Sequence, residues 1–101
     1  MNKKPQLIPL LNFFAETLRE TLEQSGLSQA EIARRCGIPT PHLTRMKQGK
    51  RRCTPVYDLR LSAFFGITPG MWMNLQLDFE FMRADPGKGD AIRKEVQPRA
   101  A

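Results

Sequence analysis

The sequence has few of the residues from which metal centres and catalytic sites are built. Its 101 residues include two cysteines, Cys36 and Cys53, and one histidine, His42. A structural zinc site needs four ligands, so this set is too small to form one. No serine or cysteine nucleophile with a carboxylate partner can be placed around His42, and no glycine-rich phosphate loop is present. We therefore expect a protein that is not an enzyme and has no metal and no cofactor.

The same three residues have ordinary structural interpretations. The spacing of the two cysteines leaves a disulfide open, but a chain that is not exported keeps its thiols reduced. We expect two free thiols, with Cys36 in the core and Cys53 in a loop. His42 is interpreted as a helix-surface residue, with a phosphate contact as its alternative role.

Long apolar runs are also absent. The longest, around residues 7–14 and 61–67, end well before the ~20 residues that a membrane-spanning helix needs. The N-terminus is basic, but Pro9 and Asn12 break the apolar segment behind it, so we identify no signal peptide. The sequence predicts a cytoplasmic protein with no membrane partner.

No segment sustains the alternation of polar and apolar residues that marks a strand, so the predicted fold class is all-α. A first helix is expected over about residues 10–25, and Gly26 ends it. Its apolar residues recur at intervals of three and four: Leu11, Phe14, Leu18 and Leu22. A second helix is expected over residues 29–36, where Ser28 and Glu31 form a capping box and Gly37 suits the turn that follows.

Three Thr-Pro pairs follow at regular spacing, at residues 40–41, 54–55 and 68–69. Threonine supplies an N-cap acceptor, and proline in the first helical position lacks the N–H that would have no partner there. The pairs predict helices near residues 41–48, 55–65 and 69–83. Gly49 and Gly66 end the first two helices, and Pro86-Gly87 ends the third.

The chain divides into one domain over residues 1–83, with its central motif at about 28–48, and a tail over residues 84–101. The tail is rich in charged residues, proline and glycine, which offer little to bury, so we expect it to be flexible. A short helix over residues 91–96 remains open.

The net charge of +6 is concentrated in the middle of the chain. Residues 1–26 carry three basic and three acidic side chains, and residues 67–101 carry five of each. Residues 27–66 carry eight basic residues against Glu31 and Asp58, which accounts for the whole excess. Such a stripe attracts a phosphate backbone, although a solvated face is the alternative.

The spacing of six residues in this basic segment is typical of a helix-turn-helix. Small Ala33 allows two helices to approach closely, Gly37 makes the tight turn, and Gln29 begins the first helix of the motif. Three apolar residues anchor the second helix on the core: Ile38, Leu43 and Met46. The predicted partner is therefore double-stranded DNA.

If Leu43 and Met46 face inward, five other residues form the exposed side of that helix: Thr40, Pro41, Thr44, Arg45 and Gln48. Arg45 is the candidate base reader, because a guanidinium bonds guanine O6 and N7 together. A phosphate contact or a free surface arginine is its alternative. Ser28 and Gln29 suit a phosphate oxygen at a helix N-terminus. Four basic residues are interpreted as backbone clamps: Lys47, Lys50, Arg51 and Arg52.

Several segments resemble a known family. Residues 26–33, Gly-Leu-Ser-Gln-Ala-Glu-Ile-Ala, with Gly37-Ile38, resemble the phage-repressor-like XRE, or Cro/CI, helix-turn-helix family. Residues 68–76, Thr-Pro-Gly-Met-Trp-Met-Asn-Leu-Gln, resemble its HigA/VapI subfamily of antitoxins, as do Gly-Lys-Arg at 49–51, Leu-Arg-Leu at 59–61 and Phe-Gly at 65–66. The resemblance covers about residues 12–83.

The resemblance implies a five-helix, homodimeric transcriptional repressor that binds its own operator and neutralises a RelE-like toxin encoded beside it. The chain departs from the family pattern in four places. Residues 8–12 replace the usual His-Pro-Gly-Glu stretch before the first helix, Asp58 and Ser62 stand where alanine is usual, and Gly70 stands where glutamate is usual.

The last predicted helix carries more apolar surface than one small core requires. Four residues on it are candidates for a dimer interface: Trp72, Leu75, Phe79 and Met82. An intramolecular core is the alternative. A two-fold dimer would space its recognition helices ~34 Å apart on a palindromic site.

Two other functions remain open. One is a solitary regulator of the same fold without a toxin partner, and the other is a protein-interaction module that no longer binds DNA.

Overall fold

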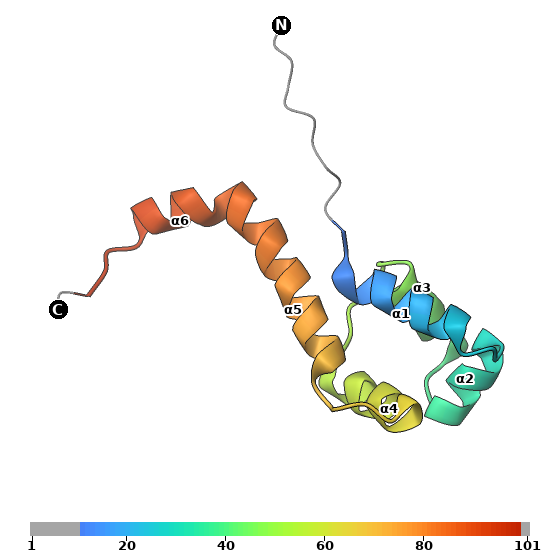
Figure 1. Ribbon diagram of the computed structural model, residues 1–101. Helices are drawn as coiled ribbons and strands as arrows, with labels where there is room; N and C mark the ends of the chain where they lie inside the picture. Colours follow the sequence, from blue (N-terminus) through green and yellow to red (C-terminus); the bar gives the residue numbers. More distant parts are fainter. Residues whose placement is uncertain (1–10, 100–101) are drawn as a thin grey trace, which may run out of the picture.

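The computed structural model describes residues 11–99, and of residues 86 and 87 only the backbone. This part of the chain contains helices and no strand, which confirms the all-α prediction (Figure 1). The helices are α1 (Phe13–Gln24), α2 (Gln29–Cys36), α3 (Thr40–Lys47), α4 (Pro55–Phe65), α5 (Met71–Ala84), the π-helical turn η1 (Asp85–Gly89) and α6 (Asp90–Glu95). The predicted start of the first helix at residue 10 and the segment considered for a signal peptide lie outside the described residues.

Local capping explains where α2 and α4 begin and end. Ser28 Oγ accepts a hydrogen bond of 3.1 Å from Glu31 N–H, and Thr54 Oγ1 accepts one of 3.2 Å from Tyr57 N–H. Each helix ends at a glycine in the left-handed region, Gly37 with φ 71° and Gly66 with φ 69°. These two helices have the bounds that the sequence predicts.

The predicted capping box is present only in half. Glu31 does not return to the backbone of Ser28; its carboxylate pairs instead with Arg34, with a distance of 2.6 Å between Arg34 Nη2 and Glu31 Oε2. A charged partner one turn further along the helix competes with the neutral N–H for that carboxylate.

Two of the three Thr-Pro pairs do not cap a helix, which corrects the prediction. Helix α3 begins at Thr40 itself, and the carbonyl of Pro39 accepts from the first free N–H groups. Thr68 and Pro69 form a turn before α5, which begins at Met71 after Gly70, with φ 103°. A carboxylate from α4, that of Asp58, caps α5 in place of Thr68.

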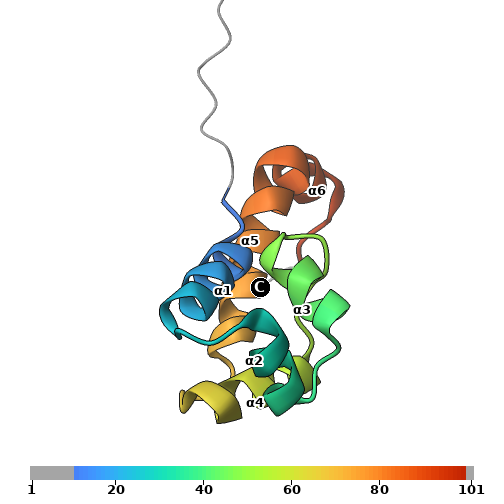
Figure 2. The ribbon, with the colours of Figure 1, turned by 90° about the vertical axis from the view of Figure 1, so that its right-hand side faces the viewer.

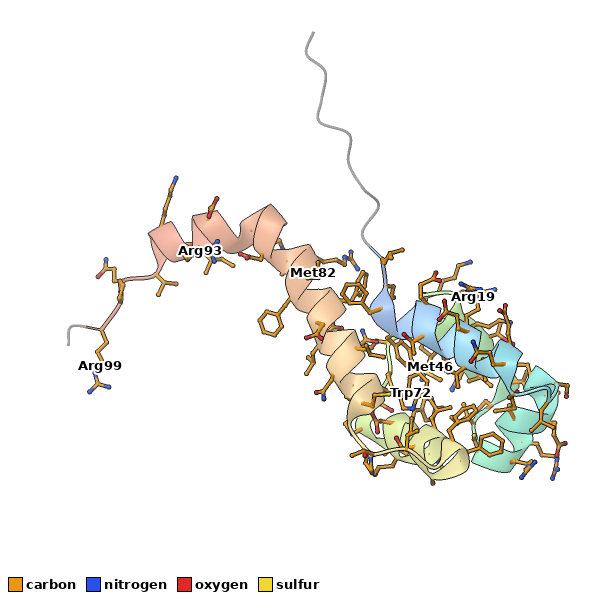
Figure 3. All side chains as sticks on the ribbon, in the orientation of Figure 1. Arg19, Met46, Trp72, Met82, Arg93 and Arg99 are labelled. Carbon is orange, nitrogen blue, oxygen red and sulfur yellow. The ribbon has the colours of Figure 1, made fainter. Side chains whose placement is uncertain are left out.

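The core lies between α1 and helices α2 to α5, and these five helices form the helical body of the chain. Trp72 from α5 is fully buried and stacks edge-on against Phe14 of α1, with ring centroids 6.0 Å apart. Figure 3 shows Trp72 and Met46 inside the helical body. Both cysteines are free thiols and buried, Cys53 in the loop before α4, as the sequence predicts.

Beyond the core, the chain continues as an arm. Pro86-Gly87 does not end the helical region: α5 passes through η1 into α6, and the chain bends there (Figure 1). A proline and a π-helical turn are both recognised causes of such a bend. Helix α6 matches the short helix that the sequence left open, and none of its residues is buried. The flexibility of residues 84–101 remains a prediction.

No helix within residues 11–99 is long and apolar enough to cross a membrane.

Candidate nucleic-acid interface

Helices α2 and α3 lie side by side and are joined by a tight turn, with α4 packed against α2 (Figure 2). The left-handed Gly37 turns the chain, and Ile38 N–H donates to the carbonyl of Ala33 at 3.0 Å. The side chains that the sequence places inside are buried there: Ile38, Leu43 and Met46. The geometry is that of a helix-turn-helix, in which the second helix presents its outer side to a DNA groove.

The outer side of α3 carries the residues that the sequence predicts. Thr40, Pro41, Arg45 and Gln48 are exposed, and Thr44 is half-buried. The structure brings two predicted site residues together, because Gln29 Nε2 donates to Thr44 Oγ1 across the two helices. Ser28 is exposed beside Gln29 at the start of α2. The hydrogen bond between Gln29 and Thr44 fixes α3 relative to the N-terminus of α2.

Four of the eight basic residues in the segment 27–66 are engaged within the chain. Arg34 pairs with Glu31, and Arg35 lies over the ring of Phe64. The guanidinium of Arg60 donates to the carbonyl of Cys36 at 3.0 Å. Arg52 pairs with Glu80 of α5 through two hydrogen bonds, of 2.7 and 3.0 Å. These four side chains have structural partners that the charge pattern did not reveal.

The other four basic residues lie on α3 and the loop after it: Arg45, Lys47, Lys50 and Arg51. Within residues 11–99, none of them has a carboxylate within ion-pair distance. Arg35 and Arg60 also lack a carboxylate partner there, so six of the eight positive charges are unpaired, and four of these six lie on the recognition helix and its following loop. That is the distribution that a phosphate backbone requires.

A small cluster joins this loop to α3 and α4. His42 Nδ1 lies 2.6 Å from the hydroxyl of Tyr57, and the guanidinium of Arg51 lies over the Tyr57 ring at 5.8 Å from its centroid. Desolvation, with the positive charges of Arg51 and Arg45, lowers the pKa of His42 from its ordinary 6.5. His42 is thus neutral at pH 7 and sits among cations. Sequence reasoning missed Tyr57, since no local signal marks it.

Sequence reasoning also missed the role of Arg60. Its Nη1 atom holds the last carbonyl of α2, directly before the glycine turn. A Cβ atom at Gly37 would lie 2.5 Å from that Nη1 atom, so the side chain occupies the space a larger residue would need. Arg60 therefore stabilises the turn of the motif.

The predicted dimer interface is corrected at Trp72. This side chain is 0% exposed and belongs to the core of its own chain, so it is not accessible to a second chain. Leu75 packs against the same core, and Phe79 is half-buried. The large exposed apolar side chains of α5 are Met82, where the prediction stands untested, together with Leu77 and Phe81. Figure 3 shows Met82 on the part of α5 that extends beyond the body.

The described residues contain no group of three or more His, Cys, Asp or Glu side chains that could hold a metal ion.

Comparison with known proteins agrees with this geometry. Residues 14–71 match the model of a helix-turn-helix domain family. The chain belongs to the helix-turn-helix family. A curated member of it, the HTH-type transcriptional regulator YddM of Escherichia coli K12, is 31% identical over 70 residues, which are 69% of this chain and 74% of that protein.

Two solved structures place the chain within the family. An addiction module antidote protein of the HigA family from Coxiella burnetii is 34% identical, with a TM-score of 0.80 over 91% of this chain and 100% of that one. The antitoxin GraA, in complex with its operator, is 32% identical, with a TM-score of 0.80 over 99% of this chain and 100% of that one. The chain is therefore a HigA-type member of the helix-turn-helix family.

Proposed function

We propose that this chain is a DNA-binding transcriptional autorepressor that also serves as the antitoxin of a toxin–antitoxin pair. The observation that carries the DNA-binding part is the group of basic residues at α3 and its loop with no carboxylate partner among residues 11–99. The antitoxin part rests on the HigA-type relatives, one of which is an antitoxin bound to its operator. The protein acts in the cytoplasm by binding, without enzymatic activity.

The side chains divide by role. Arg45 enters the major groove and reads a guanine, and Thr40, Pro41, Thr44 and Gln48 line the same side of α3. Ser28 and Gln29, at the start of α2, contact a phosphate. Lys47, Lys50 and Arg51 bind the backbone. Residues 1–83 form the DNA-binding domain, and residues 84–101 form the tail.

The salt dependence of binding tests the DNA part. We expect the affinity for the DNA upstream of the gene to fall steeply with salt, because each neutralised phosphate releases counterions. Lys50→Gln should reduce the slope of log affinity against log salt by about one. Arg34→Gln is the matched control, because Arg34 already pairs with Glu31. Binding without salt dependence, or equal slopes for both variants, would contradict the proposal.

Growth of cells tests the antitoxin part. Expression of the adjacent reading frame should arrest growth, and co-expression of this chain should relieve the arrest. A harmless neighbour, or an arrest that this chain leaves unchanged, would favour a solitary regulator. That second candidate is supported by the likeness to YddM, which is described as an uncharacterized HTH-type transcriptional regulator.

We further propose that the chain is a homodimer, joined through the exposed apolar residues of α5. Met82 is 47% exposed and Phe81 is 71% exposed, on a helix whose other side is in the core. Met82→Glu should lower the molecular mass measured by analytical ultracentrifugation to that of one chain of 11.5 kDa. Glu20→Ala, at an exposed position on α1, is the control that should leave the mass unchanged. A wild-type chain that stays monomeric at high concentration would contradict the dimer.

A further inference from the structure

The loop that follows the recognition helix is tied to α5 at its far end. This loop, residues 48–54, connects α3 to α4 and contains Lys50 and Arg51. The side chain of Gln76 on α5 reaches it, and Gln76 Oε1 accepts a hydrogen bond of 3.1 Å from the backbone N–H of Cys53. Both residues are buried, Gln76 at 4% and Cys53 at 0% exposed. A buried N–H that has one acceptor depends on it strongly.

A second contact stands one helical turn further along α5. Gln76 Nε2 donates to Glu80 Oε2 at 2.8 Å, and the Glu80 carboxylate accepts two hydrogen bonds from Arg52, of 2.7 Å from Nε and 3.0 Å from Nη2. Arg52 first, and Gln76 second, lower the pKa of Glu80, so this carboxylate is ionised at neutral pH. Gln76, Glu80 and Arg52 thus form one connected chain of hydrogen bonds, which we name the α5 brace.

The near end of the loop is fixed by its own backbone. Gly49 has φ 77°, and Lys50 N–H donates to the carbonyl of Arg45 at 2.8 Å. Between that turn and the α5 brace, the loop holds Lys50 exposed and Arg51 half-buried against Tyr57. Without the brace, the far end of the loop would keep only the burial of Cys53 and the cap at Thr54, so it would be less ordered, and ordering it again would cost binding free energy.

We propose that Gln76 and Glu80 are positioning residues for DNA binding, which hold the loop so that Lys50 and Arg51 face the phosphate backbone. In this account Arg52 belongs to the brace and is not a phosphate clamp, although its place in the basic segment suggested one. The inference rests on the proposed DNA-binding function and adds a second element, α5, to the site. It also gives Gln76, the last residue of the segment 68–76, a role in binding.

A double-mutant cycle on the full chain tests the brace. Affinity for the DNA upstream of the gene is measured for Arg52→Ala, Glu80→Ala and the double variant. If the pair positions the loop, each single variant should bind about three- to tenfold more weakly, and the double variant no more weakly than either single one. If Arg52 binds DNA and Glu80 merely masks it, Glu80→Ala should bind more tightly, which would overturn the proposal.

Two further variants separate position from charge. Arg52→Lys keeps the positive charge but loses the paired donors. Its DNA affinity should therefore fall almost as far as that of Arg52→Ala. Full binding by Arg52→Lys would identify Arg52 as a simple phosphate contact. Glu16→Ala removes one carboxylate from an exposed ion pair on α1, as Glu80→Ala does on α5, and controls for net charge. The Glu16→Ala variant should bind DNA more tightly than the Glu80→Ala variant does.

Hydrogen exchange tests the same brace without DNA. Gln76→Met keeps the size of the side chain but removes the acceptor for Cys53 N–H, so this amide should exchange at least tenfold faster, while core amides of α1 keep their protection. Unchanged exchange at Cys53 would overturn the proposal. If the wild-type chain shows no specific DNA binding, the proposed function fails. If the wild type binds and all brace variants bind equally well, only the inference about α5 fails.

Discussion

The carboxylate of Asp58 in α4 caps the N-terminus of α5 through Met73. Asp58 Oδ2 accepts a hydrogen bond of 2.8 Å from Met73 N–H, and Asp58 Oδ1 accepts from Gly70 N–H at 2.8 Å and from Ser62 Oγ at 3.1 Å. Asp58 is 2% exposed, so these three donors satisfy a buried carboxyl group. Asp58, Ser62 and Gly70 therefore belong to one hydrogen-bonded network.

Removal of this carboxylate should destabilise the fold. Asp58→Ala leaves two half-buried backbone donors and one buried hydroxyl without their acceptor, and we expect a loss of about 2–4 kcal/mol in the free energy of unfolding, measured by urea denaturation. Ser62→Ala removes only one of the three hydrogen bonds and should cost about 1 kcal/mol or less. Equal losses for the two variants would show that the cap on α5 contributes nothing.

The turn of the motif offers a matched pair of glycines. Gly37 and Gly66 have nearly the same φ, 71° and 69°, but a Cβ atom at Gly37 would lie 2.5 Å from Arg60 Nη1, whereas one at Gly66 meets nothing within 4 Å. Gly66→Ala should cost about 1 kcal/mol from backbone strain alone. Gly37→Ala should cost about 1 kcal/mol more, because Arg60 must leave the carbonyl of Cys36. Denaturation curves that coincide for the two variants would refute this role of Arg60.

Nuclear magnetic resonance can follow His42 directly, since it is the one histidine of the chain. Desolvation and the charges of Arg51 and Arg45 lower its pKa, so its titration midpoint should lie below 6.5. Bound DNA should raise the midpoint, because phosphates offset the two arginine charges. Arg51→Gln should raise it without DNA. A midpoint at or above 6.5 in the free chain would contradict the geometry of this cluster.

The same lowered pKa has a consequence for stability. The folded chain binds a proton at His42 less readily than the unfolded chain, whose pKa is the ordinary 6.5. The contribution of His42 is therefore fully present above pH 6.5 and is lost as the pH falls through the lower, folded-state pKa. Substitution of His42→Asn should remove this part of the acid dependence of the unfolding free energy. If the unfolding free energy of the variant depends on pH as that of the wild type does, this contribution of His42 is contradicted.

Local patterns predicted the parts of the fold that local contacts determine. Helices α2 and α4 begin as expected because Ser28 and Thr54 accept from N–H groups three residues away, and they end as expected at Gly37 and Gly66. Thr68 failed as a cap because Asp58, ten residues earlier in the sequence, supplies the acceptor. No local pattern distinguishes Thr54, which caps a helix, from Thr68, which does not, because each is followed by proline.

The candidate site was predictable to the same extent. Burial of Leu43 and Met46 followed from helical spacing, and with it the exposed side of α3. The sequence could not separate engaged cations from free ones, because Arg52 finds Glu80 at a distance of 28 residues along the chain. Trp72 looked like surplus apolar surface until its contact with Phe14 placed it in the core.

Sequence discrimination by Arg45 tests the central claim most directly. Binding of the wild type and of Arg45→Ala is compared on the DNA upstream of the gene and on copies with single guanine replacements, with Arg34→Ala as the control. We predict that Arg45→Ala loses about 1–3 kcal/mol on the natural site and no longer responds to one of the guanine replacements, while Arg34→Ala keeps both. Equal affinity and equal discrimination in wild type and Arg45→Ala would contradict a recognition role for α3.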